Sequence, residues 1–151
     1  MLAVLLIVAG VATAVFAHRA SEHSAIGSAA QAARAAAQTR VPTVLSYDVN
    51  TIDTEFAKVT DNLTGKFRDD FAQLSSSVII PAAHKDAIVT KATVAGSAVV
   101  TAARDRVTLL LFLNQETTSS HYQGPRLDGS RVRVTMAGSG DDWLISEITP
   151  V

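Results

Sequence analysis

The sequence predicts an α+β protein: an N-terminal transmembrane helix, then helices packed on a curved four-stranded antiparallel sheet. Three observations predict this class. An uninterrupted apolar run opens the chain, apolar residues recur at helical spacing as far as Pro81, and strand-like alternation follows it. Helices followed by a run of strands are typical of α+β folds. The length of 151 residues suits one domain.

Residues 1–17 are predicted to be a transmembrane anchor, since they include no charged residue, Asn or Gln. A helix of this length extends about 25 Å, against roughly 30 Å of bilayer hydrocarbon. A cleaved signal peptide and a buried soluble helix are the alternatives. Val15-Phe16-Ala17 offers a cleavage site, but the basic segment of a signal peptide is missing. Helical sequence continues past Ala17, so we expect an uncleaved anchor, with Met1 an internal start.

Residues 18–45 are predicted to be an Ala-rich helical stalk that merges into the first helix of a domain spanning residues 46–151. Alanine has the highest helix propensity, and small or apolar residues recur at Ile26, Ala30, Ala33 and Ala37. This stripe packs either on the domain's own sheet or on a partner helix. Pro42 is expected to kink or end the helix.

Two further amphipathic helices follow. Asn50 or Thr51 is expected to cap the first and Thr64 the second. Their apolar faces are predicted to be Ile52, Phe56, Val59 and Leu63, and then Phe67, Phe71, Leu74 and Val78. The three phenylalanines are expected in the core.

The strands are predicted from the change of period after Pro81. On the first, one face is expected to hold Ile88, Thr90, Ala92, Val94, Gly96, Ala98 and Val100, with Lys91, Thr93 and Ser97 opposite. Gly96 indicates a bend or bulge. Residues 107–115 are apolar on both faces and should be the central strand.

The last two predicted strands are residues 131–136 and 143–148, joined by a hairpin turn at residues 138–141. Trp143 is expected in the core with its indole N–H paired. Residues 118–130 are predicted to be one long irregular stretch, which in compact domains is often functional.

Several function classes are excluded or disfavoured. A net charge of −1 argues against nucleic-acid binding, and the absence of Cys removes thiol nucleophiles and cysteine-based zinc sites. The histidines have no metal-ligand spacing, so neither a metal nor a cofactor is expected. The predicted strands carry almost no inward acid or base, and His84 is expected in a polar turn. We therefore expect a protein that is not an enzyme.

Short motifs in a fixed order carry a family resemblance. They are Leu45-Ser46-Tyr47-Asp48, Leu63-Thr64-Gly65, Phe67-Arg68-Asp69, Leu111-Phe112-Leu113-Asn114-Gln115, Arg126-Leu127-Asp128-Gly129-Ser130-Arg131-Val132 and Val134, then Trp143 and Pro150-Val151. With the apolar helix before them, they resemble the Mce-associated membrane proteins. These are accessory proteins of bacterial mammalian-cell-entry lipid importers, with an NTF2-like or VirB8-like outer domain. Family members usually carry a cytoplasmic segment before the anchor, which this sequence does not show.

The resemblance implies a non-catalytic accessory subunit that assembles or stabilises an Mce-type lipid or sterol importer. It implies a single-pass anchor in the inner membrane, a C-terminal domain on the outer (periplasmic) side, and importer subunits and the bilayer as partners. One alternative is a lipid-binding carrier, with its cavity between the strand at 107–113 and Phe56, Phe67 and Phe71. Another is a VirB8-like secretion-system assembly factor.

Seven residues are candidates for partner or ligand contacts: Tyr47, Asp48, Asn114, Gln115, His121, Tyr122 and Arg126. All but Arg126 have a purely structural alternative. Asp48 can accept backbone N–H groups before a helix, and the amides at 114–115 can pair with nearby backbone. His121 and Tyr122 can be ordinary residues of an exposed loop. The pair Asp128-Gly129 is expected to form a turn.

Overall fold

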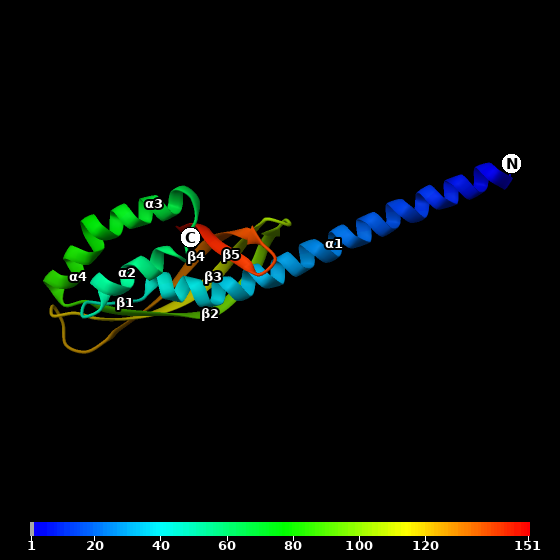
Figure 1. Ribbon diagram of the computed structural model, residues 1–151. Coiled ribbons are helices and arrows are strands. Elements are labelled where there is room, and N and C mark those ends of the chain that lie inside the picture. Colours follow the sequence, from blue (N-terminus) through cyan, green and yellow to red (C-terminus); the bar gives the residue numbers. More distant parts are fainter. Residues whose placement is uncertain (1) are drawn as a thin grey trace.

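The computed structural model describes residues 2–151, with side chains described for residues 21–138 and 140–151. Helix α1 (Leu2–Leu45) leads into a domain in which α2 (Ile52–Thr60), α3 (Gly65–Leu74) and α4 (Ile80–Asp86) accompany one sheet. Figure 1 shows α1 extending out of the domain toward the N-terminus, with α3 and α4 arching over the sheet side that carries α2. The predicted α+β class is confirmed.

The sheet has five strands in chain order, all antiparallel. They are β1 (Tyr47–Asp48), β2 (Val89–Ala102), β3 (Arg106–Thr118), β4 (Arg126–Ser139) and β5 (Asp142–Pro150). The prediction of four strands was wrong because β1 has only two residues, too few to show alternation. The prediction that residues 107–115 form the central strand is confirmed.

The C-terminal half of α1 packs on the domain's own sheet, which decides between the two alternatives for Ala33 and Ala37 of the predicted stripe. Ile26 and Ala30 are only partly buried, because Ala29 and not Ala30 takes the inward position. Ala29, Ala33, Ala37, Val41 and Val44 are buried and share one core cluster with the inward residues of β3, β4 and β5. Small side chains let the helix backbone approach the strands closely. The helix does not end at Pro42 but continues to Leu45. Burial of Val41 and Val44 on either side offsets the lost backbone hydrogen bond.

Helix α3, the π-helical turn η1 (Ser75–Ile79) and helix α4 form one continuous helical run over residues 65–86, which we call the arch. The winding of this run changes at η1. The predicted apolar face was wrong in its second half, because Leu74 and Val78 are about half exposed. The inward residues instead follow a spacing of four: Phe67, Phe71, Ser75, Ile79 and Ala83. Four residues overshoot one α-helical turn, and the wider turn of η1 corrects this drift.

The helix start signals were partly right. The stripe Ile52, Phe56, Val59 and Leu63 lies inward on and just after α2, as predicted. Thr51 and Thr64 occupy the N-cap positions of α2 and α3, but neither side chain makes a capping hydrogen bond. His84 lies in the last turn of α4 rather than in a loop, because Pro81 occupies the first turn of that helix, where proline is tolerated.

Two bulges interrupt β2, one between Val94 and Gly96, as predicted, and one between Val99 and Thr101. Thr90 and Ala92 lie inward before the first bulge. Beyond it the alternation reverses, so Ser97 faces α1 and accepts a hydrogen bond from Arg34 Nε at 2.7 Å. The one-residue insertion moves the side chains between the two bulges to the other face, which explains why Ala98 is exposed. Val100 is the unpaired residue of the second bulge and is exposed as well.

The end of β4 and the start of β5 form the tight turn that the sequence predicts. Trp143 is fully buried, and its Nε1 donates to the carbonyl oxygen of Gly140 at 2.7 Å, so its predicted position is confirmed. A Cβ atom on Gly138 would overlap the backbone of Asp142 and lie 2.8 Å from Trp143 Cα. Glycine is therefore required at position 138.

The predicted anchor at residues 1–17 lies outside the residues whose side chains are described, and it stays a prediction. Among the described residues, no helix is long and apolar enough to cross a bilayer.

Candidate functional site

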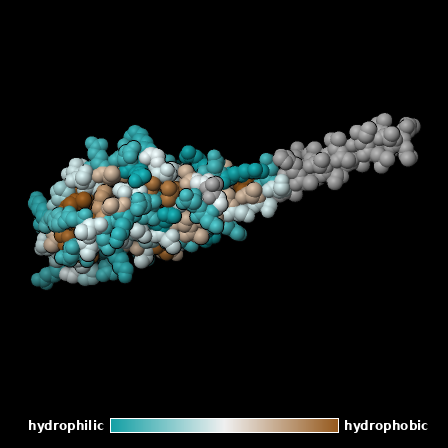
Figure 2. Space-filling model, in the orientation of Figure 1, coloured by the Kyte–Doolittle hydropathy of each residue, from teal (hydrophilic) through white to brown (hydrophobic). Residues whose placement is uncertain are grey.

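A pocket of about 620 Å³ lies between the arch and the sheet, at the end of the domain where β1 pairs with β2. Its lining comes from the end of α1, β1, α2, the arch, and the adjoining parts of β2, β3 and β4. This volume is within the range of small-molecule sites, roughly 300–1,000 Å³. In Figure 2, apolar residues are visible between the arch and α2.

The walls of the pocket are mainly apolar. Phe56 of α2 and Phe71 of α3 stack with ring centroids 6.1 Å apart and planes 11° apart. Aliphatic side chains complete the walls: Val44, Leu45, Ile52, Val59, Ile79 and Ile88. A ligand held here would bury apolar surface on several sides.

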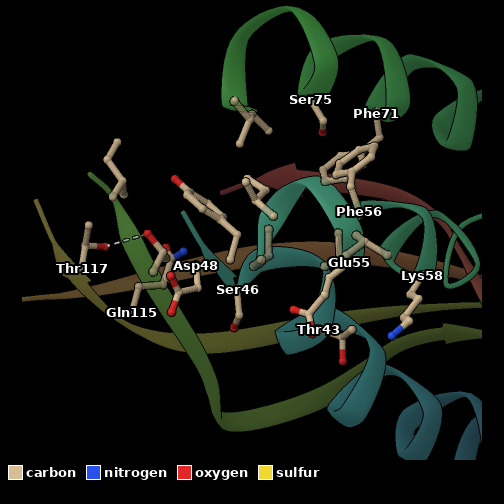
Figure 3. Close-up of a pocket in the computed structure, with 18 of the residues that line it drawn as sticks. Thr43, Ser46, Asp48, Glu55, Phe56, Lys58, Phe71, Ser75, Gln115 and Thr117 are labelled. Atoms are coloured by element: carbon tan, nitrogen blue, oxygen red, sulfur yellow. Dashed lines mark hydrogen bonds between the residues drawn. The ribbon is translucent and has the colours of Figure 1, made fainter. Parts of the chain in front are cut away.

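Ser75 is one of the polar residues that line this pocket, and it belongs to the arch. Its side chain is fully buried, and its Oγ has no hydrogen-bond partner among the described residues. Figure 3 shows the hydroxyl directed downward from the arch, beside the rings of Phe56 and Phe71. Ser75 also opens the π-helical turn η1, and such turns occur often at functional sites. A buried hydroxyl without a partner costs free energy, so it suggests a ligand group.

Ser75→Ala is expected to stabilise the ligand-free chain by about 1 kcal/mol, because it removes an unsatisfied buried hydroxyl from apolar surroundings. Denaturant unfolding followed by fluorescence measures this, since Trp143 is the only tryptophan. The matched control is Ser76→Ala, next in the chain but exposed, with its Oγ donating to the Gln73 carbonyl at 3.0 Å. A loss of stability in Ser75→Ala larger than that in the control would contradict this reading of the hydroxyl.

The rim of the pocket carries more negative than positive charge. Asp48, Glu55 and Asp128 contribute carboxylates, and Lys58 contributes the one ammonium group among the described lining residues. Asp48 Oδ1 accepts the Asn50 backbone N–H at 2.9 Å, and Glu55 Oε2 accepts from the Thr51 hydroxyl at 3.0 Å. These bonds keep the first two carboxylates at the rim.

Three of the seven predicted contact residues come together in the pocket: Tyr47, Asp48 and Gln115. Tyr47 and Asp48 form β1, and Asp48 also accepts a backbone N–H just before α2, as its structural alternative proposed. Asn114 is exposed and, one position from Gln115 along β3, lies on the opposite sheet face. The structure therefore separates the two adjacent amides.

The other three residues form a separate cluster at the β3–β4 connection. His121 Nε2 lies 2.8 Å from Asp86 Oδ1, and the Tyr122 hydroxyl donates to the Thr117 carbonyl at 3.1 Å. The Arg126 guanidinium lies 4.1 Å from the centroid of the Tyr122 ring. These contacts fasten the connection to the end of α4 and to β3.

The long irregular stretch is shorter than predicted, because β4 already begins at Arg126, opposite Thr117 of β3. Asp128 and Gly129 are therefore strand residues, not a turn. This correction places Asp128 opposite Gln115, beside the pocket.

The cavity wall expected for the carrier alternative was partly right. Leu113 lines a smaller pocket of about 340 Å³ together with Phe67 and Phe71, and Phe56 and Phe71 line the main pocket. Val107, Leu109 and Leu111 are instead fully buried in the cluster shared with α1. The main pocket lies further along the sheet, at Thr90, Gln115 and Thr117. Sequence reasoning also missed Ser75, although the spacing of four from Phe67 and Phe71 pointed to it.

Within the part of the chain whose side chains are described, no three His, Asp or Glu residues gather as a metal site requires. His84 pairs with Asp53 at 3.0 Å and His121 with Asp86, both outside the pocket.

Sequence comparison gives the family. The family described as "Uncharacterized protein Rv1363c/MT1408-like" matches residues 1–151. The chain belongs to this family. Uncharacterized protein Rv1362c of Mycobacterium tuberculosis is 37% identical over 123 residues, covering 82% of the chain and 56% of that protein. Outer membrane protein Rv1973 of the same species is 38% identical over 108 residues, covering 72% and 67%. The chain spans just over half the length of the first of these relatives.

Solved structures give the fold of this Rv1363c-like chain. An IcmL-like type IV secretion system protein from Legionella pneumophila superposes with a TM-score of 0.65 at 11% identity, covering 81% of the chain and 92% of that structure. A periplasmic fragment of TraM gives 0.64 at 9%, covering 80% and 95%. Agrobacterium tumefaciens VirB8 gives 0.57 at 12%, covering 80% and 90%. The predicted VirB8-like fold is confirmed; the resemblance to Mce-associated proteins stays a prediction.

Proposed function

We propose that the chain is a non-catalytic, membrane-anchored subunit that assembles or stabilises a cell-envelope complex, and that this complex is an Mce-type lipid importer. The observation that carries the proposal is the continuity of α1 with the domain. Five α1 residues from Ala29 to Val44 are buried in the domain core, so the domain is fixed to the C-terminal half of the helix. A rigid link of this kind suits a protein that positions partners.

Further contacts support this link. Arg34 and Gln38 of α1 both donate to the Ser97 hydroxyl of β2, at 2.7 and 3.2 Å. Arg40 donates to the Asn62 side-chain oxygen, at 3.0 Å. These bonds hold α1 to both the sheet and the segment after α2.

The family relation and the fold support an envelope location. One relative is named an outer membrane protein, and one structural neighbour is a periplasmic fragment. We propose a single-pass anchor in the inner membrane at residues 1–17, with the domain on the outer side. The Mce-type complex is proposed from the motif resemblance alone.

Deletion of the gene tests the proposal. An assembly subunit is needed for the persistence of its partners, so the importer subunits are expected to fall in abundance and lipid uptake with them. Quantitative proteomics of the membrane fraction and uptake of labelled lipid measure both, with complementation by the full chain as the control. Unchanged subunit levels together with unchanged uptake would contradict the proposal.

A further inference from the structure

We propose that the pocket beneath the arch binds one uncharged, largely apolar molecule whose single hydroxyl or carbonyl group hydrogen-bonds to Ser75. This inference goes beyond the assembly role and does not depend on which complex the chain joins.

The Ser75 hydroxyl determines where the polar group of the ligand lies in the pocket. Its hydroxyl can both donate and accept, so it fits an alcohol or a carbonyl equally well. It is fully buried, has no partner among the described residues, and points into the pocket. Its neighbours Ser76 and Ser77 are exposed, and each donates to the Gln73 carbonyl, so they are already paired.

The apolar body of the ligand follows from the walls. The Phe56–Phe71 stack and the aliphatic residues of α1 and α2 line a volume of about 620 Å³. Contact with them would remove apolar surface from water on both the ligand and the protein.

The negative charge of the pocket rim indicates that the ligand is uncharged. Three carboxylates against one ammonium group give the described rim a negative balance that disfavours a carboxylate ligand. A carboxylate seated at Ser75 would also be removed from water with one hydroxyl as its partner, which costs far more than burying an alcohol. An uncharged alcohol or ketone avoids both costs.

Photoaffinity labelling of the full chain in its own membranes tests the proposal. The probes are diazirine- and alkyne-bearing forms of hexadecanol, cholesterol and hexadecanoic acid; the first and third differ only in their polar group. Peptide mass spectrometry then locates the labelled residues. At least one alcohol probe is expected to label pocket-lining peptides, more strongly than the acid does.

Two variants with matched controls sharpen the test. Ser75→Ala is expected to reduce labelling by the alcohol about 3- to 10-fold, the loss of one hydrogen bond, whereas Ser76→Ala leaves it unchanged.

Asp128→Lys reverses one rim charge and is expected to raise labelling by the acid, whereas Asp141→Lys, exposed and outside this pocket, does not. Asp128 is exposed, so its variant is expected to keep the fold and tests the charge argument independently of Ser75→Ala.

Each other outcome overturns the proposal. If every probe labels only residues outside the pocket, the pocket is not the binding site. If the acid labels the wild-type pocket more strongly than the alcohols do, the proposal that the ligand is uncharged is wrong. If the alcohol labels Ser75→Ala and Ser76→Ala equally, the Ser75 hydroxyl does not bind the ligand.

Discussion

Ala37→Asp is expected to lower the free energy of unfolding by roughly 3 kcal/mol or more, and to release α1 from the sheet. Ala37 is fully buried in the core cluster that α1 shares with β3, β4 and β5. An aspartate there would place an unpaired carboxylate among apolar side chains, one of the most destabilising kinds of substitution. Denaturant unfolding followed by Trp143 fluorescence measures the loss, and limited proteolysis shows whether α1 becomes accessible.

The matched control for this prediction is Ala35→Asp. Ala35 lies on the same helix but is exposed, so its variant is expected to lose only about 0.7 kcal/mol, the helix-propensity difference between Ala and Asp. If both variants lose stability equally, the effect comes from helix propensity and not from docking, and the rigid link is not supported.

Trp143→Ala is expected to destabilise the domain by about 3–5 kcal/mol, the usual cost of removing a buried tryptophan. Its side chain is fully buried, and its indole N–H is the donor to Gly140 in the β4–β5 turn. The variant therefore loses both core packing and a turn bond. Far-UV circular dichroism during chemical denaturation measures the change without relying on the removed fluorophore.

Leu127→Ala is the comparison for this substitution. Leu127 is 76% exposed on β4, so truncating it leaves no cavity, and a change below about 0.5 kcal/mol is expected. Trp143→Phe should lie between the two, because it keeps much of the packing but not the hydrogen bond. Equal stability of Trp143→Ala and Leu127→Ala would show that Trp143 is not part of the core.

The fold could be predicted wherever a strong period persisted over several residues. Residues 107–115 were identifiable as the central strand because both faces are apolar. The errors arose where the period changed within an element. The bulge after Val94 reversed the faces of β2, the π turn at Ser75 rotated the face of the arch, and β1 was too short to show any period.

The candidate site could be predicted only in part, for a similar reason. Tyr47, Asp48 and Gln115 were selected within motifs, and the fold brings them to one pocket. Ser75 carried no chemical signal, because one serine among three looks like a polar surface. Its position four residues after Phe71 indicated an inward side chain, but its lack of a partner depends on the pocket, which is assembled from segments distant in sequence.

Affinity purification of the tagged full-length chain from its own membranes, in mild detergent, tests the proposed function most directly. Mass spectrometry identifies the proteins that accompany it, with Ala35→Asp and Ala37→Asp purified in parallel. We expect Mce-type substrate-binding, permease or ATPase subunits with the wild type and with Ala35→Asp, and their loss with Ala37→Asp. Secretion-system components in place of importer subunits, or no envelope partner at all, would contradict the proposed role.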